Sequence, residues 1–154
     1  MIGLLASIFL FLIIAFRTNR NITGNQIVHI WLFTIAFQCT FDVFVEIKYD
    51  GYWYFDKEIE WIDLLPHLFI IPPVNMMFLN WYPFKSSIYL KGLYIFLWVI
   101  GILIYESLTL LPQPFGYFNY GWWKLSYAAV LDPFLFIFLL LFYKFICKLE
   151  KASS

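Results

Sequence analysis

Long apolar segments, separated by short polar connections, dominate the chain. Five of them approach the roughly 20 residues that a helix needs to cross the hydrocarbon core of a bilayer. We expect helices over residues 1–16, 27–45, 62–82, 88–111 and 122–146. The first segment is short, but Arg17 and Arg20 after it can reach the membrane surface with their long side chains. The pattern therefore predicts an all-α, polytopic membrane helix bundle: one transmembrane domain of about five helices.

The composition agrees with this pattern and excludes other classes of protein. Of the 154 residues, 63% are hydrophobic, 24% aromatic and 13% charged. A soluble domain of this size buries only about two thirds of the surface of its chain, so lipid is the solvent that accepts the remainder. The net charge is zero and no block of like charge is present, which argues against nucleic acid as a partner.

No metal site and no cofactor is predicted. The two cysteines, Cys39 and Cys147, lie in different predicted helices and form no CxxC motif. A disulfide between them is not expected, and we interpret both as packing residues.

The positions of lysine and arginine indicate the orientation of the helices. If the N-terminus lies outside, seven basic residues fall on the inner side: Arg17, Arg20, Lys85, Lys91, Lys144, Lys148 and Lys151. Three fall on the outer side: Lys48, Lys57 and Lys124. We therefore expect an N-out/C-in, multi-pass protein of the cell membrane.

A stripe of polar residues follows the second predicted helix. Thr34, Gln38, Asp42 and Glu46 recur at intervals of four, which stacks their side chains on one helix face. Exposing such a stripe to lipid is very unfavourable, so it must face other helices or another subunit. Interhelical hydrogen bonds and a water-exposed path both explain it.

The third predicted helix contains an acidic residue, a histidine and a pair of prolines. Asp63 and His67 are four residues apart near the outer side, and a structural hydrogen bond is the commoner reason for such a pair than a proton relay. Pro72 and Pro73 remove two backbone donors, which predicts a kink or break. Broken helices occur at transport sites, but also where a helix bends in order to pack.

Two further carboxyl groups fall inside predicted helices. Glu106 lies near the outer end of the fourth helix, and Asp132 lies near mid-membrane in the fifth, where its insertion costs about 2.5–3.5 kcal/mol. Together with Asp42 and His67 they fall at comparable depth, so we expect these four to line one outward-facing polar cavity or cation site. The residues expected to support it are Thr34, Gln38, Glu46 and Asn75.

The longest connection, residues 46–61, is acidic and aromatic. Most of its aromatic side chains are explained by anchoring at the membrane interface. The loop is also predicted to be an external docking or ligand-sensing surface. The residues that we assign to this surface are Tyr52, Trp53, Asp56, Glu58, Glu60 and Trp61.

Residues 50–146 resemble a known family. The pattern is Tyr82-Pro83-Phe84-Lys85, Tyr94-x-x-x-Trp98, Glu106, Gly121-Trp122 and Tyr143-Lys144. It resembles small, functionally uncharacterised multi-pass membrane proteins of endospore-forming Gram-positive bacteria. The resemblance implies a topology and a bacterial host, and it transfers no catalytic residue.

Three classes of function follow from these patterns. A non-catalytic membrane component, such as a scaffold, sensor or partner subunit, is the first expectation, because no soluble domain and no strong motif is present. An oligomeric channel or transporter for a cation, proton or small solute is the alternative. A membrane enzyme acting on a lipid is the third, although Ser/His/Asp, HExxH and Gly-rich phosphate motifs are absent from the sequence. The expected partners are the lipid bilayer, a second copy of the chain, and a membrane or extracellular protein.

Overall fold

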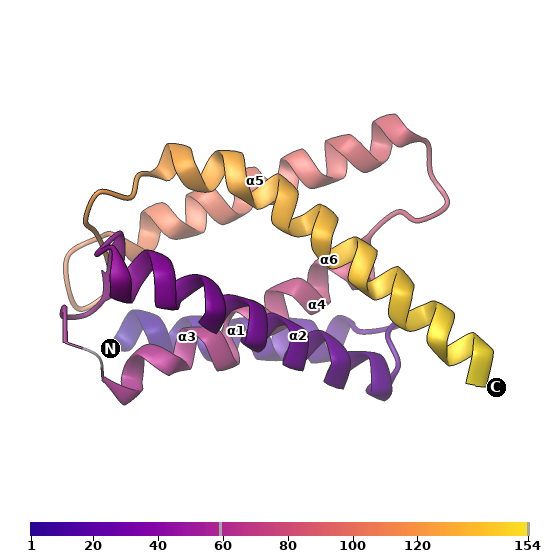
Figure 1. Ribbon diagram of the computed structural model, residues 1–154, viewed down its shortest axis with the longest axis horizontal. Coiled ribbons are helices and arrows are strands. Elements are labelled where there is room, and N and C mark those ends of the chain that lie inside the picture. The colour runs from indigo at the N-terminus through magenta and orange to yellow at the C-terminus, as the bar shows by residue number, and fades with distance from the viewer. Residues whose placement is uncertain (59, 154) are drawn as a thin grey trace.

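The computed structural model describes residues 1–58 and 60–153 as a bundle of helices with one small pair of strands (Figure 1). The helices are α1 (Ile2–Thr18), α2 (Gly24–Asp42), α3 (Leu64–Phe69), α4 (Ile71–Trp81), α5 (Ile88–Thr109) and α6 (Leu125–Ser153). A π-helical turn, Val43–Lys48, continues α2, and a 3-10 turn, Trp61–Asp63, precedes α3. The strands are β1 (Tyr52–Tyr54) and β2 (Phe118–Tyr120).

The predicted all-α membrane bundle is confirmed. Within the described residues, four helical segments are long and apolar enough to cross a membrane: Gly24–Lys48, Trp61–Trp81, Ile88–Thr109 and Leu125–Ala152. The fifth apolar helix, α1, has 17 residues. Large apolar side chains are exposed along the outside of the bundle, such as Phe96 on α5 and Phe134 on α6. This is the arrangement expected of helices that are solvated by lipid.

Helix α4 is the centre of the bundle. It contacts α1 and α2, and α6 packs against it from the layer that α5 and α6 form together (Figure 1). Met76, Phe78 and Leu79 on α4 are almost completely buried. The ring of Phe78 stacks on that of Phe136 of α6, with 4.2 Å between the ring centroids.

The break predicted in the third membrane segment is confirmed. Helix α3 ends at Phe69, α4 begins at Ile71, and Ile70 between them has φ −109° and ψ −56°. Pro72 lies in the first turn of α4, where a backbone N–H is not needed within the helix. The indole Nε1–H of Trp31 on α2 donates to the carbonyl of Leu68 over 3.0 Å. This donor takes the place of the N–H that Pro72 lacks.

Replacement of Trp31 by Phe is expected to lower the free energy of unfolding by about 1–3 kcal/mol, because the Leu68 carbonyl is left unpaired inside the bundle. Unfolding by sodium dodecyl sulfate in mixed micelles measures the change. Trp61→Phe is the matched control, since the Trp61 side chain is 86% exposed. Equal stability of the two variants would show that the indole hydrogen bond does not hold the break.

The two connections at one end of the bundle join to form a cap. β1 and β2 pair antiparallel, with Tyr52 opposite Tyr120. The backbone N–H groups of Gly121 and Trp123 both donate to the carbonyl of Gly51, over 2.8 and 3.0 Å. A Cβ at position 121 would lie 2.1 Å from the carbonyl oxygen of Asp50, so only glycine allows this approach. We call residues 49–55 and 117–123 the cap.

The cap corrects part of the predicted external surface. Tyr52 is buried, because its ring faces the bundle and packs against Phe118 and Trp123. Trp53 is half-buried. The other residues assigned to this surface, Asp56, Glu58, Glu60 and Trp61, are exposed.

The opposite end of the bundle is fixed by one buried side chain. The Oδ1 atom of Asn80 on α4 accepts from the backbone N–H groups of Arg20 and Asn21, over 3.0 and 3.1 Å. Its Nδ2 donates to the carbonyl of Thr18 over 2.8 Å. These three bonds hold the α1–α2 connection against the end of α4.

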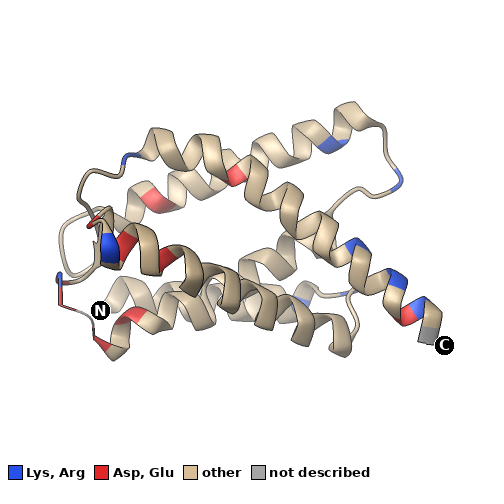
Figure 2. Cartoon of the chain, in the orientation of Figure 1, with Lys and Arg blue, Asp and Glu red and all other residues tan. Residues whose placement is uncertain are grey.

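The charged residues divide between the two ends. Figure 2 shows most of the acidic residues towards the end that carries the cap, and most lysines and arginines towards the end where α6 terminates. This is the asymmetry from which the sequence predicts the orientation.

Candidate functional site

The carboxyl group of Asp42, at the C-terminal end of α2, is buried and contacts side chains from three elements: α2, β1 and α3. Its Oδ1 accepts from the hydroxyl of Tyr52 on β1 and from the Nε2 amide of Gln38 on α2, the latter over 3.2 Å. Its Oδ2 lies 3.1 Å from Nε2 of His67 on α3. The Asp42 residue is only 4% exposed. The carboxyl group therefore fastens the cap and α3 to α2.

The hydroxyl of Tyr52 is a permanent donor in this group. Burial raises its pKa, and the nearby carboxyl group of Asp42 raises it further. The neighbouring strand residue, Tyr54, packs edge to face with the ring of His67, with 5.3 Å between the ring centroids. Both tyrosines of β1 thus contact the Asp42–His67 pair.

A cavity of about 440 Å³ lies beside this pair at the cap end of the bundle. We call it the acidic cavity and define it by Asp42, Glu46, Glu60, Asp63 and His67, all of which line it. One ligand atom from each of Asp42, Glu46 and His67 lies within 4.8 Å of the others. The acidic cavity is therefore a convergence of carboxyl groups around one imidazole.

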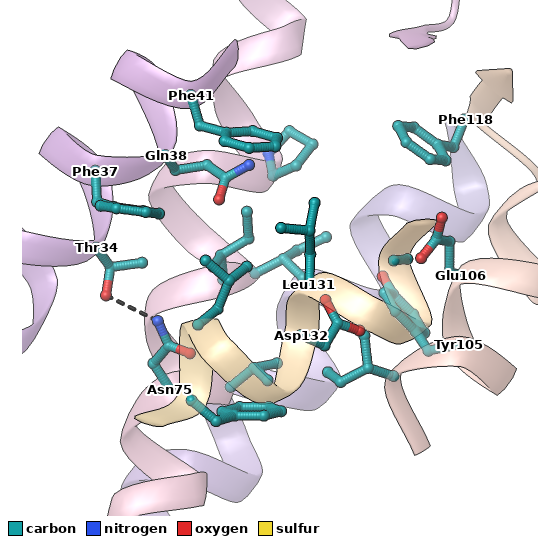
Figure 3. A pocket seen from close by; sticks show the side chains of 18 of the residues that line it. Thr34, Phe37, Gln38, Phe41, Asn75, Tyr105, Glu106, Phe118, Leu131 and Asp132 are labelled. Atoms are coloured by element: carbon teal, nitrogen blue, oxygen red, sulfur yellow. Dashed lines mark hydrogen bonds between the residues drawn. The ribbon is translucent and has the colours of Figure 1, made fainter. Parts of the chain in front are cut away.

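A second cavity, of about 250 Å³, lies inside the bundle between α2, α4, α5 and α6 (Figure 3). We call it the central cavity. Aromatic and aliphatic side chains form most of its wall, and Tyr52 and Tyr54 close it at the cap. The polar side chains other than tyrosine that line it are Thr34, Gln38, Asn75, Glu106, Thr109 and Asp132.

The polar residues of the central cavity differ in how well they are paired. Asn75 on α4 donates to the hydroxyl of Thr34 on α2 over 3.0 Å, across the cavity from Glu106 (Figure 3). Glu106 accepts from the hydroxyl of Tyr120, whose pKa is raised by burial and by this hydrogen bond. Asp132 lies within electrostatic range of Glu106, but its buried Oδ2 has no hydrogen-bond partner among the described residues.

The structure divides the four residues that the sequence predicts to share one cavity. Asp42 and His67 line the acidic cavity, whereas Glu106 and Asp132 line the central cavity. Tyr52 of the cap contacts both regions, because its hydroxyl donates to Asp42 while its side chain lines the central cavity. The predicted supporting residues divide in the same way: Glu46 lines the acidic cavity, and Thr34, Gln38 and Asn75 line the central one.

Sequence reasoning missed two contributors to these sites. Tyr52 was assigned to the outer surface, and Tyr120 was not assigned to a site at all. Both reach their carboxyl partners only because β1 and β2 pair, and no local pattern indicates that pairing. Glu46 was assigned a supporting role, although its spacing of four from Asp42 already placed the two carboxyl groups on one face.

No protein-family model, no curated protein and no solved structure matches the chain. The resemblance to membrane proteins of endospore-forming bacteria stays a prediction.

Proposed function

We propose that the protein is a non-catalytic membrane component, a sensor or partner subunit, that binds one small amphiphilic molecule in the central cavity. The observation that carries this proposal is Oδ2 of Asp132, which has no partner among the described residues and lies on the wall of an otherwise largely apolar cavity. A buried polar atom without a partner is unfavourable, and a ligand that donates a hydrogen bond removes that cost.

The size and lining of the cavity define the class of ligand. An apolar cavity of about 150 Å³ binds benzene, so a cavity of about 250 Å³ accepts roughly ten non-hydrogen atoms. The rings of Phe37, Phe41 and Phe118 favour a flat or cationic group beside them. Asp132 and Glu106 favour an amine over a carboxylate. The ligand class that fits best is a small aromatic or aliphatic amine.

The amine 3-phenylpropylamine is the probe for this proposal, and the alcohol 3-phenylpropanol is its neutral counterpart. In lipid nanodiscs, we expect the wild-type protein to bind the amine at least tenfold more tightly than the alcohol. We expect Asp132→Asn to lose this preference, because the asparagine carries no negative charge. Calorimetric titration measures both affinities.

Asp56→Asn is the matched control for the charge, because Asp56 is exposed beyond β1 and does not line the cavity. It is expected to keep the preference for the amine. An Asp132→Asn protein that discriminates as well as the wild type would contradict the proposal.

A channel or carrier is the second candidate, and the break in the third membrane segment favours it. Ile70, the residue between α3 and α4, lines the central cavity. Broken helices of this kind are common at transport sites. Liposomes with a pH-sensitive dye inside distinguish the two candidates: proton or amine entry above that of protein-free liposomes supports a carrier, and binding without entry supports a sensor or partner subunit.

The orientation and location belong to the same proposal. The concentration of basic residues at the end where α6 terminates supports an N-out/C-in arrangement in the cell membrane. The acidic cavity then faces the outside of the cell. The family resemblance favours a Gram-positive host.

A further inference from the structure

We propose that the acidic cavity is a divalent metal site, with Asp42, Glu46 and His67 as its ligands. This inference is independent of the central cavity and of whatever binds there. It rests on the geometry of the three side chains, on the unpaired atoms beside them, and on the balance of charge around the cavity.

The spacing of the ligand atoms suits a small metal ion. Zn²⁺ bonds of about 2.0–2.2 Å in a tetrahedron place neighbouring ligand atoms roughly 3.3–3.6 Å apart. Nε2 of His67 and Oδ2 of Asp42 are already 3.1 Å apart. The atom from Glu46 completes a group whose members all lie within 4.8 Å of one another. Binding of one ion would draw the three ligand atoms to these shorter separations.

The backbone around the cavity holds these ligands in place from two helical elements. Asp42 ends α2, and Glu46 follows it in the π-helical turn, so both carboxyl groups come from one continuous helical segment. π-Helical turns are frequent at functional sites. His67 comes from α3, which packs against α2. A metal bound here would join the two helices.

Unpaired atoms beside the three residues point independently to a ligand. Asp63 lines the same cavity and is 8% exposed. Its Oδ2 accepts from the backbone N–H of Glu60 over 2.8 Å, whereas its buried Oδ1 has no hydrogen-bond partner among the described residues. Oδ1 of Asp63 is therefore a buried, unpaired acceptor on the wall of the same cavity, outside the group that Asp42, Glu46 and His67 form.

The charge around the cavity also favours a cation. Four carboxyl groups line it, those of Asp42, Glu46, Glu60 and Asp63, and no lysine or arginine is among the described residues that line it. Carboxylates crowded in a poorly solvated site repel one another unless a cation or protons compensate them. A divalent ion balances two of these charges at once.

The ligand types select the class of metal. Ca²⁺ and Mg²⁺ are bound through oxygen atoms, and Mg²⁺ usually keeps several waters. An imidazole among carboxylates suits Zn²⁺ or another divalent transition ion instead. The site is therefore expected to prefer Zn²⁺ and Co²⁺ to Ca²⁺.

Titration of the untagged protein in nanodiscs with Zn²⁺, and separately with Co²⁺, tests the site. We expect one equivalent of Zn²⁺ to bind, and Co²⁺ to give the visible absorption of a low-symmetry site that includes nitrogen. Glu46→Gln and His67→Gln are expected to weaken Zn²⁺ binding by 10-fold to 100-fold. Glu46 is only half-buried and takes no part in the Tyr52–Asp42 hydrogen bond. Glu46→Gln therefore still tests the site if His67→Gln fails to fold.

Glu58→Gln is the matched control, since Glu58 is exposed on the same connection and does not line the cavity. It should bind Zn²⁺ like the wild type. The proposal is overturned if the folded wild-type protein binds no Zn²⁺ at millimolar concentration, if Glu46→Gln binds as tightly as the wild type, or if Ca²⁺ competes equally with Zn²⁺. Failure of these experiments leaves the amine-binding proposal untouched, because the two cavities have no carboxyl group in common.

Discussion

Replacement of Asp42 by Ala is expected to lower the free energy of unfolding by about 3–5 kcal/mol, a large fraction of the stability of a small domain. The variant leaves the Tyr52 hydroxyl, the Gln38 amide and Nε2 of His67 without their acceptor. Each buried donor that loses its partner costs about 1–3 kcal/mol. Unfolding by sodium dodecyl sulfate, carried out in the presence of a metal chelator, measures the effect on folding alone.

Proteolysis gives a second measurement of the same variant. Without the Tyr52–Asp42 bond the cap loses its buried hydrogen bond to α2, so cleavage within residues 49–58 is expected to be faster in Asp42→Ala than in the wild type. Asp56→Ala, an exposed acidic residue of the same connection, is the control and is expected to change stability by less than about 0.5 kcal/mol. If Asp42→Ala resists unfolding and cleavage as well as the control, the Tyr52–Asp42 bond does not hold the cap.

At the other end of the bundle, Asn80→Ala is expected to cost about 2–4 kcal/mol. The side chain of Asn80 makes three hydrogen bonds to the backbone of the α1–α2 connection, at Thr18, Arg20 and Asn21. The cost is below the sum for three buried groups, because the N–H groups of the exposed residues Arg20 and Asn21 can bond to water instead. The same unfolding titration measures it.

Asn80→Asp separates the two kinds of bond that Asn80 makes. Aspartate keeps the acceptor for the N–H groups of Arg20 and Asn21 and loses the donor to the carbonyl of Thr18. Its stability should therefore fall between those of Asn80→Ala and the wild type. An Asn80→Ala protein as stable as the wild type would mean that packing, and not these bonds, fixes the connection.

The helices could be predicted from the sequence because their determinants are local. A run of apolar residues of sufficient length specifies a membrane helix regardless of its neighbours. Pro72 and Pro73 specify a break in the same way, since the missing N–H groups belong to the prolines themselves. Most predicted helix boundaries therefore lie within a few residues of those observed, and the break lies at Ile70, beside the prolines.

The sites could be predicted only in part, because they depend on contacts between distant segments. Spacing along a helix gives depth in the membrane, and it correctly put Asp42 and His67 at the same level. It cannot show which helices are neighbours or what lies between them. Tyr52 and Tyr120 pair across 68 positions of sequence, and the cap that they form separates the residues that depth alone had grouped together.

The length of α6 connects the central cavity to the lipids around the protein. The helix has 29 residues, or roughly 44 Å at 1.5 Å per residue, against about 30 Å for a bilayer core. It crosses the bundle obliquely, and its last turns extend past the other helices (Figure 1). Lys144, Lys148 and Lys151 occupy these turns, where each is attracted to anionic headgroups by about 1 kcal/mol. Because Leu131 and Asp132 of the same helix line the central cavity, we expect a change in bilayer thickness or in anionic lipid content to tilt one of its walls.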